Sequence, residues 1–238
     1  PDTTQTDEPL VVFFYGGGWR DGAKGHYEFV ATSLTKSGIV VMIPDYRLYP
    51  DVRFPAFVED GAAAVAWAYA NAEKFGANPA HVYLMGHSAG AHIAALLALN
   101  PQYLESYELS PERLAGFIGL AGPYDFLPLT LEYLEDVFPE NSREASQPIN
   151  FVTPKAPPTL LIHGTGDNTV LPANSASLAD KLRANGVPTT FRQYDGVGHA
   201  RVVATLAPAL DFLSGTLEDS KSFIRETCPA SPCLITTD

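Results

Sequence analysis

The stretch Gly86-His87-Ser88-Ala89-Gly90 decides the fold of this chain. It follows a short apolar run, residues 81–85, and precedes an alanine- and leucine-rich run, residues 91–99. A serine in a G-x-S-x-G pattern between a strand and a helix sits on a sharp turn that exposes its hydroxyl group. The flanking positions must be small because the helix passes close to the strand, and the two glycines and Ala89 satisfy this need. We therefore interpret Ser88 as a nucleophile; the alternative is a glycine-rich loop that contains a serine by chance.

The segments around this stretch alternate between strand-like and helix-like patterns without an internal repeat. Continuous apolar runs are typical of strands buried on both faces of a sheet. We expect strands at residues 10–15, 39–43, 81–85, 116–121, 158–163 and 189–194, and helices at residues 27–36, 57–74, 91–99, 172–185 and 202–213. This alternation predicts an α/β fold, a doubly wound and mainly parallel sheet with helices on both faces. The functional site of such a sheet lies beyond the carboxyl ends of its strands.

Residues 122–157 interrupt the alternation. They mix aromatic and leucine side chains with six prolines. A long irregular insert over the strand ends typically forms a lid or a pocket wall, and a decorated surface loop is the alternative. Apart from this insert and a tail at residues 228–238, we expect residues 1–238 to form a single domain.

The composition excludes several classes of partner. Apolar residues make up 46% and charged residues 18% of the chain, which is typical of a soluble domain with a filled core. The formal net charge of −12 argues against nucleic acid or an anionic membrane, because both require a basic face. No apolar run approaches the roughly 20 residues that span a bilayer. Residues 1–9 carry no signal peptide, so export after loss of an N-terminal segment stays an alternative and the compartment is not predicted.

The two cysteines, Cys228 and Cys233, both lie in the tail. They leave two alternatives open, a local disulfide or two free thiols. No histidine–cysteine cluster accompanies them that would indicate zinc. We predict neither a metal site nor an organic cofactor, and the oligomeric state is not predicted.

A nucleophilic serine requires a base, and the chain contains six histidines. His199 follows the last predicted strand in the loop 196–200, where two glycines allow the chain to carry the imidazole over the sheet edge. His87 and His92 are too close to the nucleophile in sequence for their rings to reach its hydroxyl. His163 ends a buried strand, where a structural hydrogen bond is the simpler role. We therefore expect His199 to be the base.

The base in turn requires an acid that orients it. Asp167 lies in the loop 163–170 after the fifth predicted strand, where its carboxylate can accept the second ring N–H of His199. Asp195 is the alternative, but it shares a short loop with His199, which makes the approach awkward. The order Ser88, Asp167, His199 is that of the nucleophile, acid and base of α/β-hydrolases.

Three consecutive glycines, Gly16-Gly17-Gly18, follow the first predicted strand. Without side chains they expose backbone N–H groups to a developing oxyanion, although three glycines alone would usually form a turn. Their place after a buried strand and upstream of Ser88 favours an oxyanion hole. We expect its donors to be Gly17, Gly18 and Ala89.

Taken together, these motifs resemble the α/β-hydrolase carboxylesterases of the hormone-sensitive-lipase-like group. Within it the chain is most similar to small bacterial esterases related to the bifunctional feruloyl and acetyl-xylan esterases and to kynurenine formamidases. The resemblance implies an α/β-hydrolase fold with a short lid-like insert, and it implies that residues 44–48 brace the oxyanion loop. The segments that carry it are Tyr15-Gly16-Gly17-Gly18-Trp19, Pro44-Asp45-Tyr46-Arg47-Leu48, Gly86-His87-Ser88-Ala89-Gly90, Gly122-Pro123-Tyr124-Asp125, His163-Gly164-Thr165-Gly166-Asp167 and Gly198-His199.

Two features depart from this family pattern. Tyr15 stands where the group usually has a histidine, which in the group is usually structural. Relatives also carry two antiparallel strands before the first strand predicted here. We therefore expect either that these strands have been lost or that the sheet has an exposed edge.

We predict a serine carboxylesterase that hydrolyses short-chain acyl esters of small molecules through an acyl-enzyme intermediate. Trp19, Tyr124, Phe126 and Leu127 are candidates for the pocket walls, and ordinary packing under the insert is their alternative. An aryl-formamide or amide hydrolase would use the same residues and is the alternative activity. A non-catalytic binding module on a hydrolase scaffold is the alternative from another class.

Overall fold

The computed structural model describes residues 7–228, in which a single parallel sheet of six strands forms the centre. Its spatial order is β2-β1-β3-β4-β5-β6. All five neighbouring pairs are parallel. The predicted doubly wound α/β sheet is thereby confirmed. The strands are β1 (Glu8–Phe14), β2 (Val40–Met42), β3 (Ala77–His87), β4 (Gly116–Leu120), β5 (Thr159–Gly164) and β6 (Thr189–Tyr194).

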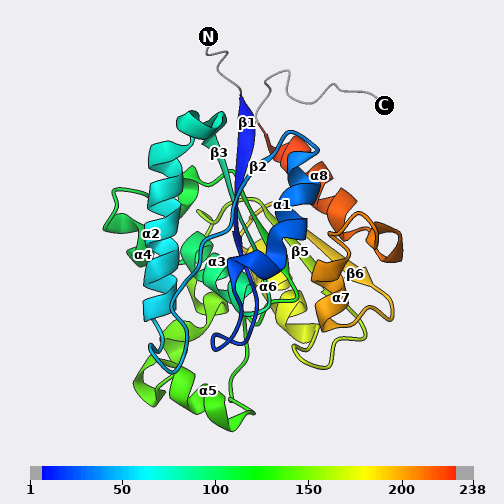
Figure 1. The fold of residues 1–238 in the computed structure, drawn as a ribbon. Helices are drawn as coiled ribbons and strands as arrows, with labels where there is room; N and C mark the ends of the chain where they lie inside the picture. The colour runs from blue at the N-terminus through cyan, green and yellow to red at the C-terminus, as the bar shows by residue number, and fades with distance from the viewer. Residues whose placement is uncertain (1–6, 229–238) are drawn as a thin grey trace.

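Helices cover both faces of this sheet. Figure 1 shows α2 and α4 on one side and α1 and α8 on the other. The α-helices are α1 (Glu28–Thr35), α2 (Ala56–Asn71), α3 (Ala89–Leu99), α4 (Gln102–Glu105), α5 (Glu132–Val137), α6 (Ala173–Ala184), α7 (His199–Ala204) and α8 (Thr216–Thr227). The insert between β4 and β5 contains α5, which lies at the end of the molecule toward which β1 runs (Figure 1).

The strands and helices at the centre of the protein form because folding removes their apolar side chains from water. Residues 10–14 of β1, residues 82–87 of β3 and all of β4 and β5 are buried. Every residue of α3 is buried as well, since the sheet covers one side of this helix and α2, α4 and the insert cover the rest. A helix that is apolar all round must lie inside the protein. The core is therefore thickest around β3 and α3, directly beside Ser88.

The last third of the chain differs from the sequence prediction. The helix expected over residues 202–213 is wrong in its extent, because α7 ends at Ala204 and only a 3₁₀ turn, Asp211–Leu213, follows. Pro208 explains the break, since proline lacks the N–H that a helix interior needs and disfavours helix in the residue before it. The prediction also missed α8, which buries Leu217, Phe223 and Ile224 against the sheet.

One edge of the sheet is formed by β2, which is only three residues long and half-buried. Within residues 7–228 no strand precedes β1, so β2 is an edge strand of the described sheet. In this described part of the chain, no helix has both the length and the apolar character needed to cross a bilayer. Cys228 lies 3.3 Å from His81 Nδ1, whereas Cys233 falls outside the described residues, so the disulfide stays untested.

Candidate active site

Ser88 occupies the sharp turn between β3 and α3. Its φ of 55° and ψ of −122° place a non-glycine residue in a strained region of backbone conformation. A Cβ at Gly90 would overlap the carbonyl oxygen of Phe14 on β1, and a Cβ at Gly86 would overlap the carbonyl oxygen of Gly90. Strand and helix therefore approach so closely that only glycine fits on either side of the serine. The surrounding packing holds the strained turn in place.

The structure brings Ser88, His199 and Asp167 together from three separate loops. Ser88 Oγ lies 2.8 Å from His199 Nε2, and His199 Nδ1 lies 2.7 Å from Asp167 Oδ2. Since a carboxylate accepts only, Nδ1–H donates to Asp167, which leaves Nε2 free to accept the hydroxyl proton of Ser88. The His199 side chain is 16% exposed and that of Asp167 is fully buried. The arrangement can therefore pass a proton between the serine and the imidazole while the carboxylate stays dry.

Asp167 is held as an anion by several donors. Burial raises its pKa, but hydrogen bonds from His163, His199 and the Val170 N–H outweigh burial and leave the pKa well below its ordinary value. Its Oδ1 accepts the backbone N–H groups of Thr169 at 2.8 Å and Val170 at 3.0 Å. The carboxylate is thus ionised and fixed in orientation throughout the neutral range.

The alternative acid, Asp195, lies elsewhere. Its Oδ1 accepts a hydrogen bond from Thr165 Oγ1 at 2.9 Å on an exposed loop. That hydroxyl in turn accepts the backbone N–H of Gly196 at 2.9 Å. Asp195 therefore ties two loops together and does not bond to His199.

His163 makes the structural hydrogen bonds expected of it, but one of its partners is the candidate acid. Its Nε2 lies 3.2 Å from Asp167 Oδ2 and 2.9 Å from the carbonyl oxygen of Val170, so this nitrogen carries the proton. Its Nδ1 lies 2.7 Å from Ser175 Oγ and accepts that hydroxyl proton. The sequence-based interpretation of His163 did not include this link to the acid. The signal was the spacing of four residues between a strand-end histidine and the aspartate.

His87 also touches the candidate base. Its ring centroid lies 4.8 Å from that of His199, and its Nε2 donates to the His199 carbonyl oxygen at 3.1 Å. Burial, together with the neighbouring His199, lowers the pKa of His87 to about 3. Within residues 7–228 its Nδ1 is buried without a hydrogen-bond partner and lies beside Gly16. His87 is therefore a neutral ring that packs between the base and the glycine loop.

The glycine loop after β1 has the backbone that exposed N–H groups require. Gly17 and Gly18 have φ values of 135° and 61°, and Trp19 follows at 59°. Within the described chain, the N–H groups of Gly17, Gly18 and Ala89 donate to no protein acceptor. These three N–H groups thus have no acceptor in the described protein, and their role as an oxyanion hole stays a prediction.

The segment 44–48 braces this loop, as the family resemblance implied. The Tyr46 hydroxyl donates to the Tyr15 carbonyl oxygen at 2.7 Å, and the Tyr15 hydroxyl donates to Asp45 Oδ1 at 3.3 Å. The Tyr15 and Tyr46 rings stack with centroids 4.6 Å apart. The Tyr49 N–H donates to the Trp19 carbonyl oxygen at 2.8 Å. Tyr15 therefore has a structural role, because its contacts hold the start of the glycine loop.

The four candidate pocket residues fall into different environments. Tyr124 is 0% exposed and packs edge-to-face on Phe117, so it is part of the core and does not line an open pocket. This corrects the prediction in favour of its alternative, because Gly119 and Gly122 leave room for the ring beneath the insert. Phe126 and Leu127 are half-buried.

Trp19 is 4% exposed and links the glycine loop to the insert. It stacks on Phe126 with ring centroids 6.1 Å apart and packs edge-on against Phe138 at 4.8 Å. Its Nε1–H donates to His92 Nδ1 at 3.3 Å, and His92 Nε2 donates to the Ser146 carbonyl oxygen at 2.7 Å. Burial lowers the pKa of His92 to about 4, so it is a neutral bridge between the loop and the insert.

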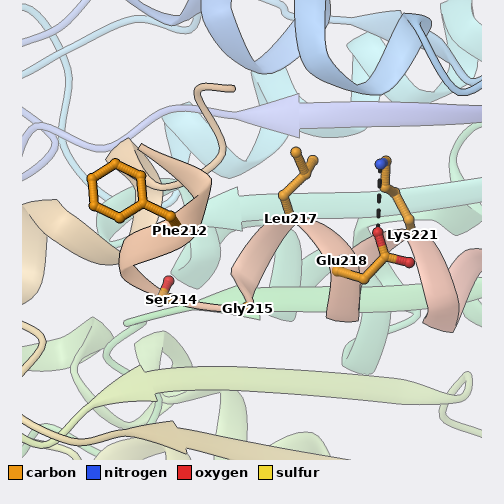
Figure 2. A pocket seen from close by; sticks show the side chains of 6 residues that line it. All are labelled: Phe212, Ser214, Gly215, Leu217, Glu218 and Lys221. Atoms are coloured by element: carbon orange, nitrogen blue, oxygen red, sulfur yellow. Dashed lines mark ion pairs between the residues drawn. The ribbon is translucent and has the colours of Figure 1, made fainter. Parts of the chain in front are cut away.

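The described surface is hollowed beside the glycine loop and at the start of α8. One hollow, of about 370 Å³, lies between the glycine loop, the start of α1 and α7. The other, of about 320 Å³, lies at the start of α8 and is shown in Figure 2, where Lys221 pairs with Glu218 at 3.5 Å. None of the candidate site residues lines this second hollow, which therefore stands apart from the site.

Comparison with protein families matches the BD-FAE model to residues 1–182. The chain belongs to the BD-FAE family. Its predicted resemblance to α/β-hydrolase carboxylesterases is confirmed. The matched range of this BD-FAE chain contains Ser88 and Asp167 but ends before His199.

Curated relatives of the BD-FAE chain carry esterase names. The chain is 34% identical to Esterase LipC of Mycobacterium tuberculosis, over 80% of this chain and 52% of LipC. It is 32% identical to the probable isoprenylcysteine alpha-carbonyl methylesterase ICMEL1 of Oryza sativa subsp. japonica, over 81% of this chain and 51% of that protein. The chain thus spans about half the length of these relatives.

Solved structures agree with the fold. The apo form of Thermogutta terrifontis esterase 2 has a TM-score of 0.81 at 24% identity. The superposition covers 98% of this chain and 88% of the esterase 2 chain. A truncated carbohydrate esterase from gut microbiota also has a TM-score of 0.81, at 21% identity over 94% of this chain and 87% of its own. The BD-FAE chain therefore has the α/β-hydrolase fold.

Proposed function

We propose that this chain is a serine carboxylesterase that hydrolyses small-molecule esters with short acyl chains. The observation that carries the proposal is the hydrogen-bonded series Ser88–His199–Asp167, with contacts of 2.8 Å and 2.7 Å. A serine hydroxyl is a weak nucleophile at neutral pH, and an adjacent oriented base is what activates it. The esterase names of the relatives agree with this chemistry.

The reaction follows from the proton positions. Ser88 Oγ bonds to the ester carbonyl carbon while its proton moves to His199 Nε2. The bond to the alcohol oxygen then breaks, and that oxygen takes the proton from Nε2 as the alcohol leaves. A water molecule next gives one proton to Nε2 while its oxygen bonds to the acyl carbon. The bond between the acyl carbon and Ser88 Oγ then breaks, and Oγ takes the proton from Nε2 as the acid departs. The buried anion of Asp167 stabilises the imidazolium in both halves.

The oxyanion of each tetrahedral intermediate is held by the N–H groups of Gly17, Gly18 and Ala89. They are free of protein acceptors within residues 7–228, so no hydrogen bond within the protein has to break when charge develops. The loss of one such donor typically costs about 2.7–4 kcal/mol of transition-state stabilisation. The brace from Tyr46 and Tyr49 keeps the loop in this conformation.

The preference for short acyl chains is supported by the packing beside the glycine loop. Trp19 is nearly buried and meets Phe126 and Phe138 of the insert. These rings take up space that a long acyl chain would need. We therefore expect a small acyl group to be preferred to a long one.

The test is hydrolysis of p-nitrophenyl esters from acetate to palmitate by the wild type and by Ser88→Ala. We expect kcat/KM to be highest for the short chains, and turnover by Ser88→Ala to fall by about 10⁶-fold, as the loss of an activated nucleophile does. The matched control is Ser106→Ala, the same change at an exposed position after α4. It should hydrolyse at the wild-type rate.

Folding of each variant is checked by circular dichroism. Folded wild type that hydrolyses no ester in the series would overturn the proposal, and hydrolysis of an aryl formamide in its place would establish the alternative activity. Turnover by Ser88→Ala at a wild-type rate would show that another group is the nucleophile.

A further inference from the structure

The carboxylate of Asp167 is shared between two imidazole rings. Its Oδ2 accepts the Nδ1–H of His199 at 2.7 Å and lies 3.2 Å from His163 Nε2. The side chains of His163 and Asp167 are both fully buried. One acceptor is enough to fix the tautomer of a catalytic base, so the reaction described above does not require the second ring. His163 is therefore a buried titratable group whose contact with the acid needs a reason of its own.

The proton of His163 has one position, because each ring nitrogen has a partner of a fixed kind. On one side Nε2 faces Asp167 Oδ2 and the carbonyl oxygen of Val170, at 2.9 Å, and both of these groups only accept. On the other side Nδ1 accepts the hydroxyl proton of Ser175, a fully buried residue of α6, at 2.7 Å. The ring therefore presents one N–H to the carboxylate and the carbonyl oxygen together.

The acid itself is held by other contacts as well. Its Oδ1 accepts two backbone N–H groups, at 2.8 Å and 3.0 Å. Its loop is tied to the loop that carries the base, because the Gly166 N–H donates to the Val197 carbonyl oxygen at 3.1 Å. Loss of the His163 N–H therefore changes the charge felt at Asp167 Oδ2 more than it changes the position of that atom.

That charge acts on the base. An N–H directs its positive end at Oδ2, so it weakens the attraction between the carboxylate and a protonated His199. Burial raises the pKa of Asp167, and the hydrogen bonds from His163 and His199 outweigh burial and lower it. Without the His163 N–H, the anion would hold the imidazolium of His199 more strongly. The base would then keep its proton to a higher pH.

The other titratable groups around these three residues leave this effect to His163. His87 of β3 faces His199 with ring centroids 4.8 Å apart, but burial lowers its pKa to about 3, so it carries no charge at neutral pH. The charged side chains of the neighbouring elements are exposed or half-exposed: Asp125 after β4, Asp180, Lys181 and Arg183 of α6, Arg192 of β6, Asp195 after it, and Arg201 of α7. Charges in contact with water are screened more strongly than buried ones.

We propose that His163, oriented by Ser175, is a positioning residue that acts through Asp167 and sets how tightly the acid holds the protonated base. The proposal rests on the esterase function proposed above. It extends the series Ser88–His199–Asp167 by two buried residues, one from β5 and one from α6.

The first test is the pH dependence of kcat/KM for phenyl acetate, from about pH 4 to about pH 9. His163→Phe keeps a ring and removes the N–H. We expect the midpoint of its acidic limb to rise by about half a pH unit or more, because the imidazolium is held more strongly. A residue that serves only in packing would lower the rate equally at every pH and leave the midpoint in place.

Two further variants separate the N–H from the shape of the ring. His163→Gln places an amide N–H about as far from the backbone as the ring Nε2, so its midpoint should stay within about 0.2 pH unit of the wild type. His81→Phe is the matched control, since His81 is a buried histidine of β3 whose Nδ1 lies 3.3 Å from Cys228 Sγ. It should leave the midpoint unchanged.

A measurement on the wild type covers the case in which His163→Phe does not fold. Nitrogen-15 NMR of the protein labelled in its histidines reports which ring nitrogen carries the proton. At neutral pH we expect His163 to carry its proton on Nε2 alone. A proton on Nδ1, or on both nitrogens, would overturn the proposal.

The kinetic results that contradict the proposal are an unchanged midpoint in His163→Phe, a midpoint that moves to lower pH, and a His163→Gln midpoint that moves as far as that of His163→Phe. In each of these cases the wild type still hydrolyses esters, so only the role of His163 fails. Folded wild type that hydrolyses no ester overturns the esterase function, and the role of His163 in the reaction fails with it.

Discussion

Replacing Asp167 with asparagine tests the hydrogen-bonded series at its most buried point. The Asp167 Oδ1 atom accepts two backbone N–H groups, from Thr169 and Val170, so the amide oxygen of asparagine keeps that place. The amide NH₂ then replaces Oδ2, opposite His199 Nδ1 and His163 Nε2. It donates to His199 Nδ1, which moves the ring proton to Nε2. In that tautomer the imidazole cannot accept the serine proton.

Asp167→Asn should lower both kcat and the free energy of unfolding. An asparagine that holds the catalytic imidazole in the wrong tautomer lowers kcat by about 10⁴, which is about 5.5 kcal/mol of transition-state stabilisation. The His163 N–H also faces the new NH₂ group and loses one acceptor. The His163 N–H keeps the Val170 carbonyl oxygen as an acceptor, so the loss is that of one hydrogen bond, about 0.5–1.5 kcal/mol of folding free energy. For a chain of this size, that lowers the Tm by about 1–6 °C.

The assay is kcat for p-nitrophenyl acetate, with the Tm measured by scanning calorimetry. The matched variant is Asp195→Asn, whose side chain bonds to Thr165 on an exposed loop. We expect it to keep kcat within about threefold of wild type, as surface changes do. The reasoning is refuted if Asp167→Asn stays within tenfold of wild type, or if Asp195→Asn loses more activity.

The tight turn and the buried histidines give three further measurable outcomes. Gly90→Ala should yield no folded soluble protein, because its Cβ overlaps the main chain of β1, whereas Gly25→Ala, with open space around it, should keep its Tm within about 3 °C. His87 and His92 have folded pKa values of about 3 and about 4, so below pH 6.5 they take up protons only on unfolding. In urea titrations the free energy of unfolding should therefore fall as the pH drops below 6.5, by up to about 1.4 kcal/mol per pH unit for each histidine. His92→Phe should reduce the slope of this fall, and equal slopes in the variant and the wild type would contradict the assignment. Trp19→Phe removes the donor to His92 Nδ1 and should lower the free energy of unfolding by about 1–3 kcal/mol in the same titration.

The central strands were predictable because burial on both faces leaves a continuous apolar run. Residues 10–14 and 82–85 show such runs, and the structure buries them completely. The turn at Ser88 was predictable for a similar reason, since its two flanking glycines are the only residues that fit. In both cases the constraint acts on neighbouring positions, so the pattern is visible locally.

The end of the chain was harder to predict, because amphipathic segments depend on what they pack against. In α8 the apolar Leu217, Phe223 and Ile224 alternate with charged residues. This apolar face is buried because the helix packs against the sheet, and the sequence of the helix alone does not show that contact. Pro208 was the local signal that the helix over residues 202–213 could not continue. Tyr124 shows the opposite case: an aromatic side chain in an irregular insert gives no sign of whether it faces a pocket or the core.

The sequence by itself determined the α/β architecture, the turn at Ser88 and the chemical types of the candidate acid and base. These follow from local rules of burial, backbone conformation and loop composition. Only the tertiary structure decided that His163 bonds to Asp167, that His92 joins the glycine loop to the insert, and that a hollow lies between that loop and α7. Such contacts join residues from different elements. Their distances depend on how helices pack on the sheet, and no local pattern records that packing.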